Sequence, residues 1–467
     1  MPLDITREEA ARVLSEALAE GGDFADVFIE ERHTTTVVCD DDRIERVNAG
    51  REIGAGIRVI HGESTAYGYT NDLSLEGLLH VARQVGKLAR QRADGEVVVS
   101  LEVRPAPYDF AVRARPDESS IAVRVALVER ANVAARREDP RVTQVLINYG
   151  DTVQRVIMAN TQGDYVEDER VRVRLAVQVV AAKSGLLQTG YEAVGGFSGL
   201  ELFEAHPPEE VARKAARRGL LMLEARPAPT GRMTVVLAAE AGGTMVHEAC
   251  GHGLEADLVQ KGLSVYAGRL GEPVASPLIT VMDDATLEGR FGSYRFDDEA
   301  TPGEKTVLIE KGVLVGYMYD RLTARREGRR SSGNGRRESY QFRPIPRMRN
   351  TYIMPGEFDP EEIIRRTDRG LLVKKMGGGQ VNTTNGDFVF EVAEGYLIEG
   401  GRVTAPVRGA TLTGNGPEVL RSVDLVGADL GFSIGICGKD GQGVPVSDAQ
   451  PTMRIPNLVV GGTAHQE

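Results

Sequence analysis

GTMVHEACGHGLEADLVQK, residues 243–261, is the stretch around which this chain is organised. It places His247, Glu248 and His252 in the pattern H-E-x-x-x-H. This pattern is one residue longer than H-E-x-x-H, in which two histidines on one helix face bind zinc and the glutamate acts as general base. The stretch therefore predicts a metal site, with Glu248 placed to activate water.

The extra residue changes the geometry that the metal site requires. On a regular α-helix five residues advance about 500°, so the side chains of His247 and His252 would point roughly 140° apart. A single π-type turn, or a break at a glycine, would bring them together. Gly251 directly precedes His252, and glycine tolerates backbone angles that other residues avoid. We therefore predict an irregular helix between the two histidines, with a bulge near Gly251.

A catalytic zinc ion needs a third protein ligand and an open position for water. The first candidate is Cys437, because it lies in GFSIGICGKDGQGVP, where a short apolar strand runs into a glycine-rich turn. Glu255 is the next candidate, although it follows His252 by three residues and has orientation of that histidine as its alternative role. The remaining candidates are Asp257 and His465.

Two other interpretations of these residues are weaker. Two histidines and a cysteine are also the ligands of blue-copper sites, but a carboxylate such as Glu248 beside His247 favours water activation. Cys250 precedes His252 by two positions and is expected to face the core. The glycine clusters at 377–379 and 414–416 lack the strand-then-helix context of a nucleotide site.

The composition limits the class of protein. A chain of 467 residues favours two domains, and 41% hydrophobic with 27% charged residues is typical of soluble globular proteins. A net charge of −12 argues against a nucleic-acid partner. The sequence shows neither an 18-residue apolar run nor a signal-peptide pattern, and its three cysteines lie far apart. We therefore expect no membrane partner and a cytoplasmic location.

Periodicity predicts a first domain over residues 1–227. Thr6 and Glu9 match a capping box at the start of the first helix. Alternating apolar and polar residues predict antiparallel meanders, and apolar stripes predict helices between them. In chain order the later elements are strands over 24–70, a helix over 73–92, a helix over 118–137, strands over 141–190 and a helix over 207–224. The order helix, meander, helix thus occurs twice.

A second domain is expected over residues 228–467. The proline-rich segment 225–231 marks the boundary, and glycine, β-branched residues and short strand patterns follow it. This domain is predicted to be mostly β, with the motif helix near its start and another helix around 359–367. Residues 324–343 are polar, basic and rich in glycine and serine, which predicts a mobile loop. The predicted fold class is α+β: an N-terminal α/β-meander domain, then a mostly β domain that carries the metal-motif helix.

The chain resembles the TldD branch of the TldD/PmbA family, which was once described as modulators of DNA gyrase and is regarded as metalloproteases. The resemblance covers nearly the whole chain and is strongest over 235–463. Two departures are Cys250, where an aliphatic residue is expected, and Ala300, where glycine is usual. The matching motifs are VHEACGHGLEAD, DDEATPGEKTVLIEKGVLVGYMYD, GNGRRESY, PRMRNTYI, GGGQVNTTNGDFVFEVAEGYLIEGG, GATLTGNGPEVL, CGKDGQGVPV and VGGT.

The resemblance implies a metal site held by His247, His252 and Cys437, with Glu248 as general base. The PmbA branch lacks the metal motif, so this chain is similar to the catalytic partner. The resemblance also implies a dimer around an enclosed cavity, either a homodimer or a heterodimer with a PmbA-like paralogue.

The resulting hypothesis is a zinc-dependent peptidase that hydrolyses unfolded or extended peptides. Glu248 would take a proton from water and pass it to the leaving amine. The alternatives are a regulatory or binding protein with a structural metal, such as a gyrase modulator, and a zinc amidase with non-peptide substrates. We expect a peptide to add to an exposed strand edge near the metal. The basic loop 324–343 would close over it through Arg336 or Arg337.

Overall fold

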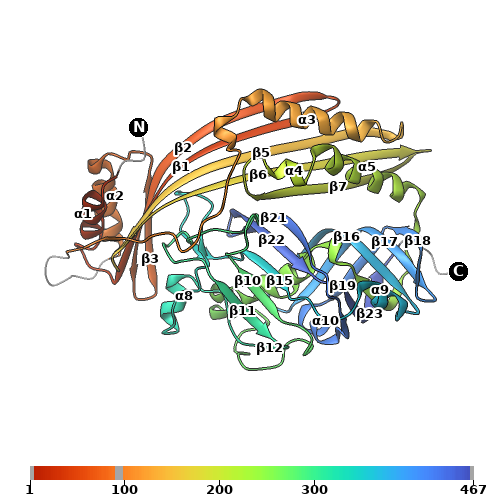
Figure 1. The fold of residues 1–467 in the computed structure, drawn as a ribbon. Helices are drawn as coiled ribbons and strands as arrows, with labels where there is room; N and C mark the ends of the chain where they lie inside the picture. Colours follow the sequence, from red (N-terminus) through yellow and green to blue (C-terminus); the bar gives the residue numbers. More distant parts are fainter. Residues whose placement is uncertain (1–4, 90–97, 463–467) are drawn as a thin grey trace.

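One long sheet, antiparallel except for the short β4, forms the N-terminal half of the molecule (Figure 1). The computed structural model describes residues 5–89 and 98–462. Both predicted meanders are present, and β1 pairs with β5, so that the two meanders make a single sheet. In the order β3-β2-β1-β5-β6, with β7 and β4 both on β6, the strands are β1 (Phe24–Asp40), β2 (Arg43–His61), β3 (Ser64–Thr70), β4 (Glu102–Val103), β5 (Val142–Asn160), β6 (Asp164–Lys183) and β7 (Leu186–Phe197).

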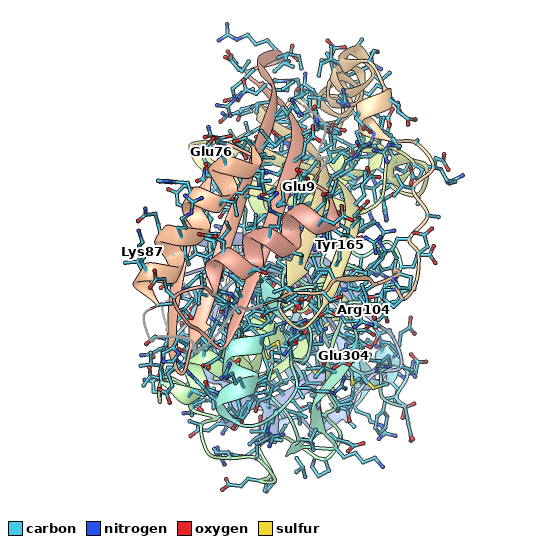
Figure 2. The ribbon with its side chains drawn as sticks, turned by 90° about the vertical axis from the view of Figure 1, so that its left-hand side faces the viewer. Glu9, Glu76, Lys87, Arg104, Tyr165 and Glu304 are labelled. Carbon is cyan, nitrogen blue, oxygen red and sulfur yellow. The ribbon has the colours of Figure 1, made fainter. Side chains whose placement is uncertain are left out.

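Two pairs of helices cover separate ends of this sheet. The predicted capping box of Thr6 and Glu9 is confirmed at the start of the first helix, and Figure 2 shows Glu76 and Lys87 on the outer side of the second. Each pair builds its own apolar core with the strands beneath it. The first pair is α1 (Arg7–Ala17) and α2 (Leu75–Leu88); the second pair is α3 (Ile121–Arg136) and α5 (Pro208–Glu224), preceded by the short α4 (Leu202–Ala205).

The C-terminal half contains two large sheets around the largest core. Together with the long sheet and its helices they make an α+β protein, as predicted, and the helix expected around 359–367 is α9 (Pro360–Arg365). The six-stranded sheet has the order β12 (Val313–Leu314), β11 (Lys305–Glu310), β10 (Val281–Asp284), β15 (Asn350–Ile353), β22 (Gln442–Gln450), β21 (Gly431–Lys439). The eight-stranded sheet contains β16 (Arg369–Val381), β9 (Gly231–Leu237), β23 (Met453–Gly461), β19 (Thr411–Asn415), β17 (Asp387–Glu399), β18 (Arg402–Arg408), β8 (Arg226–Pro227) and β20 (Leu425–Val426).

Buried ion pairs join the long sheet to the C-terminal half. Arg58 Nη2 of β2 lies 2.6 Å from Glu299 Oε1, and Arg170 Nη1 of β6 lies 2.6 Å from Asp298 Oδ1. All four side chains are buried, so removal of one partner would leave an uncompensated charge. These contacts hold the inner face of the long sheet over the C-terminal sheets, with cavities between them.

The prediction of a mobile loop over 324–343 is wrong. Helix α8 (Arg321–Arg326) covers its start, and β13 (Gly335–Arg336) pairs with β14 (Ile345–Pro346). Arg336 donates to the carbonyls of Met348 and Pro445, and Arg337 is fixed by Asp298. Both arginines are buried, and only residues around 325–330 and a few beyond 340 are exposed. The segment is therefore part of the packed domain and does not close over a substrate.

In residues 5–89 and 98–462, no helix has both the length and the apolar character needed to cross a membrane.

Candidate metal centre

The H-E-x-x-x-H segment contains the irregular turn that its spacing predicts. After α6 (Thr244–Val246) the chain forms a single π-turn over His247–Gly251, in which the amide of His252 donates to the carbonyl of His247. The ring centroids of the two histidines are consequently 4.9 Å apart. A 3₁₀ turn (His252–Leu254) and α7 (Ala256–Gln260) complete the segment.

The reason given for Gly251 is wrong, although the position of the distortion is right. Gly251 has ordinary helical angles, φ −52° and ψ −60°, so its backbone freedom is not used. A Cβ at this position would lie 2.2 Å from Sδ of Met348, which is itself fully buried. Glycine is required here because the π-turn packs directly against another segment.

We expect Gly251→Ala to destabilise the fold by about 2 kcal/mol, the typical cost of overpacking a core. The change should appear as a lower midpoint in thermal or urea unfolding. Gly378→Ala is the matched control, because nothing lies within 4 Å of a Cβ at that position. An unfolding midpoint of Gly251→Ala equal to that of the parent would show that Met348 moves aside at no cost.

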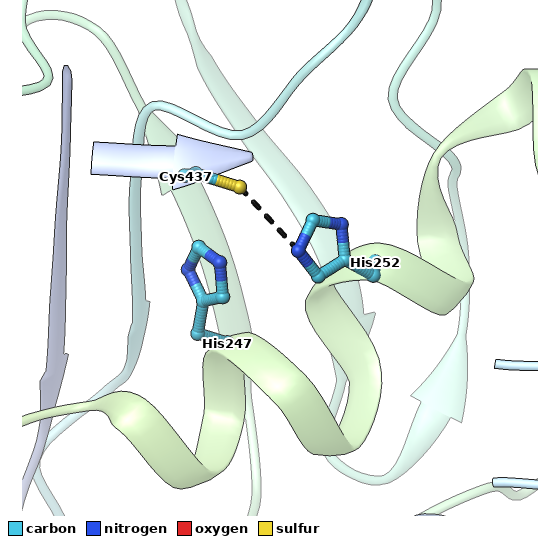
Figure 3. A group of neighbouring side chains, drawn as sticks. All are labelled: His247, His252 and Cys437. Atoms are coloured by element: carbon cyan, nitrogen blue, oxygen red, sulfur yellow. Dashed lines mark hydrogen bonds between the residues drawn. The ribbon is translucent and has the colours of Figure 1, made fainter. Parts of the chain in front are cut away.

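Three donor side chains meet at the π-turn (Figure 3). Cys437 extends from β21, 185 residues after His252, and its Sγ lies 3.4 Å from His252 Nε2. One ligand atom from each of His247, His252 and Cys437 lies within 4.8 Å of the others. Burial raises the pKa of the Cys437 thiol, but hydrogen bonding to the two histidines outweighs burial and holds this pKa at about 5. Cys437 therefore favours the thiolate form that binds metals.

The other cysteine of the motif faces away from this cluster. Cys250 is completely buried, and its Sγ donates to the carbonyl of Val246, 3.3 Å away. Burial raises the pKa of this thiol to about 12. Cys250 thus belongs to the apolar core, as the sequence predicts.

Glu255 lies where it can orient His252, which was the alternative to its being a metal ligand. Its Oε2 lies 3.0 Å from Nδ1 of His252, on the side of the ring away from Cys437. Although burial raises the pKa of Glu255, Lys439 and His252 lower it to about 2, so the carboxylate stays ionised. Asp257 is bound by Lys439 at 2.7 Å and does not reach the donor cluster. His465 lies outside the described residues.

A second carboxylate, Asp448, lies near Nδ1 of His247. The sequence patterns did not identify it. Its Oδ2 lies 3.8 Å from Nδ1 of His247, and its Oδ1 accepts from Ser433 Oγ and the Gly243 amide. No spacing rule connects Asp448 to a motif some 200 residues earlier. Each histidine therefore has a carboxylate on its Nδ1 side, as is usual for metal-binding imidazoles.

We predict that Glu255→Gln lowers zinc affinity by roughly 10- to 100-fold, the usual effect of removing the partner that orients a ligating histidine. Competition with a chromogenic chelator would measure the change. Asp257→Asn is the control, because it removes the other carboxylate on Lys439 and leaves His252 untouched. Equal affinities of the two variants would mean that the bond from Glu255 to His252 is unimportant for the metal.

The donor set matches the preferences of zinc. Two imidazoles and a thiolate are common zinc ligands, and bond lengths near 2.1 and 2.3 Å in a tetrahedron place nitrogen and sulfur about 3.6 Å apart. The observed distance of 3.4 Å between Cys437 Sγ and His252 Nε2 is close to this value.

The cluster opens into a cavity of about 650 Å³ between the long sheet and the C-terminal half. The cavity is lined by the three donor residues, Glu248, strand β21 and the inner face of β7. Burial raises the pKa of Glu248, against the lowering effect of the adjacent histidines. A carboxyl group with a raised pKa beside the donor cluster is suited to accept and return a proton.

Comparison with known proteins agrees with this geometry. The domains of the PmbA/TldA metallopeptidases match three parts of the chain: domain 1 matches residues 25–89, the central domain 114–223 and the C-terminal domain 230–462. The chain is 38% identical to a metalloprotease TldD homologue of Haemophilus influenzae over 94% of this chain and 93% of the relative. It is 25% identical to a zinc metalloprotease TldD homologue of Saccharolobus solfataricus, over 95% and 97%.

Solved structures show the same fold. A Thermotoga maritima protein described as a modulator of DNA gyrase superposes with a TM-score of 0.78 at 24% identity, over 94% of this chain and 96% of that one. TldE from Thermococcus kodakarensis superposes with a TM-score of 0.75 at 20% identity, over 97% and 99%.

Proposed function

This chain belongs to the PmbA/TldD metallopeptidase family, and we propose that it is a zinc-dependent peptidase that hydrolyses unfolded or extended peptides. The observation that carries the proposal is the meeting of His247, His252 and Cys437 beside Glu248 at the wall of a cavity. Structural zinc sites are usually closed by four protein ligands. A cluster of three donors that lines a cavity supports a catalytic metal over a structural one.

In the proposed mechanism the protein supplies orientation and proton transfer. When bound, zinc would lower the pKa of water to near 7 and polarise the scissile carbonyl. Glu248 takes a proton from the attacking water and returns it to the leaving amine. Glu255 holds the imidazole of His252 in its orientation through a 3.0 Å hydrogen bond, and Asp448 supplies a negative charge 3.8 Å from Nδ1 of His247.

The free edge of β21 is the proposed binding site for the peptide backbone. β21 is the outermost strand of its sheet and, in the part of the chain that the structure describes, pairs with β22 alone. Pro445 opposite Ile436 has no amide hydrogen, and the Ser447 amide opposite Ile434 donates to Arg349. The amides and carbonyls of Ile434 and Ile436 therefore point away from β22, towards the cavity that they line. An extended peptide adding here would use backbone hydrogen bonds, which any sequence offers.

The oligomer and its location also belong to the proposal. We place the protein in the cytoplasm as a dimer, either with itself or with a PmbA-like paralogue that lacks the metal motif. Size measurement of the pure chain, alone and with a paralogue, would separate the two forms.

We predict that this peptidase cleaves unfolded chains and short peptides and spares folded ones, because a folded protein has no free extended backbone to offer the strand edge. The test compares one polypeptide in its tightly folded form with a destabilised variant of nearly the same sequence. Comparable cleavage rates for both forms would contradict strand addition.

A further inference from the structure

A second cavity, of about 470 Å³, adjoins the metal cavity. Ile436 of β21 lines both cavities. Residues two apart on a strand share a face, so Arg170, Arg172 and Arg174 of β6 line the second cavity while Gln178 of the same strand lines the metal cavity. The two cavities thus follow one another along the inner face of the long sheet.

Arginine dominates the wall of this second cavity. Six arginines and four acidic residues line it. All four acids have partners: Asp151 pairs with Arg124 outside the cavity, Asp298 pairs with Arg170, and Glu338 and Asp297 accept from backbone amides. The fourth, Asp297, has its pKa raised to about 7 by burial and by Glu299. The six arginines are Arg32, Arg170, Arg172, Arg174, Arg336 and Arg337.

Two of these arginines are buried, and their hydrogen bonds in the described residues go to backbone carbonyls while their guanidinium groups lie over aromatic rings. Arg172 donates to the carbonyls of Phe291 and Ser293, at 3.0 and 2.7 Å. Arg336 donates to the carbonyls of Met348 and Pro445, at 2.5 and 2.8 Å. Within the described residues neither forms an ion pair with a carboxylate at 4.0 Å or less. Their exposed fractions are 8% and 4%, so both positive charges lie where water is scarce, and the carboxylate that acts on both, Asp298, is already paired with Arg170.

A third arginine of the second cavity, Arg174, contacts a residue of the metal cavity. The Nε of Arg174 is buried and has no hydrogen-bond partner in the described structure. Its Nη2 lies 3.2 Å from the hydroxyl of Tyr191, which lines the metal cavity. Burial, together with Arg170 and Arg336, lowers the pKa of Arg172 to about 9. Such crowding of like charges is costly unless an anion binds among them.

We propose that Arg172, Arg174 and Arg336 form a subsite for a carboxylate of the peptide whose backbone lies along β21. This inference rests on the proposed peptidase function and adds a preference to it. The guanidinium fork matches the planar carboxylate group and binds it through two parallel hydrogen bonds. The carboxylate is either the C-terminus of the peptide or an Asp or Glu side chain, and both present the same chemistry.

The test uses four peptides of one sequence: with glutamate and a free C-terminus, with glutamine in place of glutamate, with a C-terminal amide, and with both changes. The ratio of kcat/KM for each acidic peptide to that of the neutral one is measured with zinc-loaded parent, Arg172→Gln and Arg174→Gln. Arg155→Gln is the control, since Arg155 is 61% exposed, pairs with Glu169 and lines neither cavity.

We expect the parent to prefer at least one acidic peptide by about tenfold, and each subsite variant to lose that preference. The control should keep it. The peptide that shows the preference identifies the source of the carboxylate. Absence of any preference in the parent, or loss of the same preference in Arg155→Gln, would overturn the proposal. Arg174→Gln keeps the test valid if Arg172→Gln does not fold, because Arg174 is only partly buried.

A binding experiment distinguishes failure of this inference from failure of the proposed function. The affinities of the same four peptides for zinc-loaded Glu248→Ala are measured by fluorescence anisotropy, with and without the added Arg174→Gln change. If the parent hydrolyses no peptide, the peptidase proposal fails, yet tighter binding of an acidic peptide that depends on Arg174 still supports the subsite. Equal binding of all four peptides refutes the subsite even in an active peptidase.

Discussion

Glu248→Ala is expected to abolish peptide hydrolysis and to leave the metal and the fold in place. General acid–base catalysis contributes about 10²- to 10⁴-fold to a rate, and alanine removes the group that accepts and returns the proton. Glu248 lies on the cavity wall and is not one of the three clustered donors. Its loss should therefore lower kcat with little change in zinc content.

The measurement combines peptide turnover, zinc analysis and the unfolding midpoint of the same preparation. Glu391→Ala is the matched control, because Glu391 is another carboxylate on the wall of this cavity but lies outside the motif. We expect much smaller losses in the control. A fully active Glu248→Ala would remove the proposed mechanism, and a variant without zinc would mean that Glu248 acts as a ligand.

Cys437→Ser is expected to weaken zinc binding by more than about a hundredfold, which exceeds the usual effect of losing an outer partner of a ligand. A serine hydroxyl is not ionised near neutral pH, whereas the pKa of Cys437 is held at about 5. Zinc would keep only two of the three clustered donors.

Cys250→Ser provides the matched control on the same turn. Its thiol lies in the core and its pKa is raised to about 12, so the substitution should change stability more than metal content. Metal analysis after dialysis against a weak chelator compares the two variants. Full zinc occupancy in both would show that the third ligand lies elsewhere and would return Glu255 to consideration.

Local rules predicted the parts of the site that lie close together in sequence. Helical arithmetic required a distortion between His247 and His252, and the π-turn supplies it. The same reasoning failed to identify why Gly251 is glycine, because the answer lies in contact with Met348, 97 residues later. At Ala300, by contrast, the backbone conformation is the explanation. Its φ of +60° explains why glycine is usual there.

Long-range hydrogen bonding explains the main error of the sequence analysis. Arg336 and Arg337 lie in a polar, basic segment, and composition alone favours a solvated loop for such residues. In the structure, Arg336 donates to the carbonyl of Met348, and Arg337 donates to Asp298 through its amide and its guanidinium group, so the segment packs. Asp448 escaped notice for the same reason, since its position near His247 depends on how β22 passes the motif.

The placement of Cys437 on an outermost strand links metal exchange to local opening of the fold. In the described residues β21 has a ladder partner along one side only, β22, although Arg347 bonds to the Cys437 carbonyl and Lys439 to Glu255 and Asp257. Edge strands open with less free energy than central ones. While the imidazoles stay in the core, each fraying event of β21 would carry the thiolate away from them. The residence time of zinc should then follow the opening rate of this one strand, and a peptide bound along its free edge would slow the loss of the metal that cleaves it.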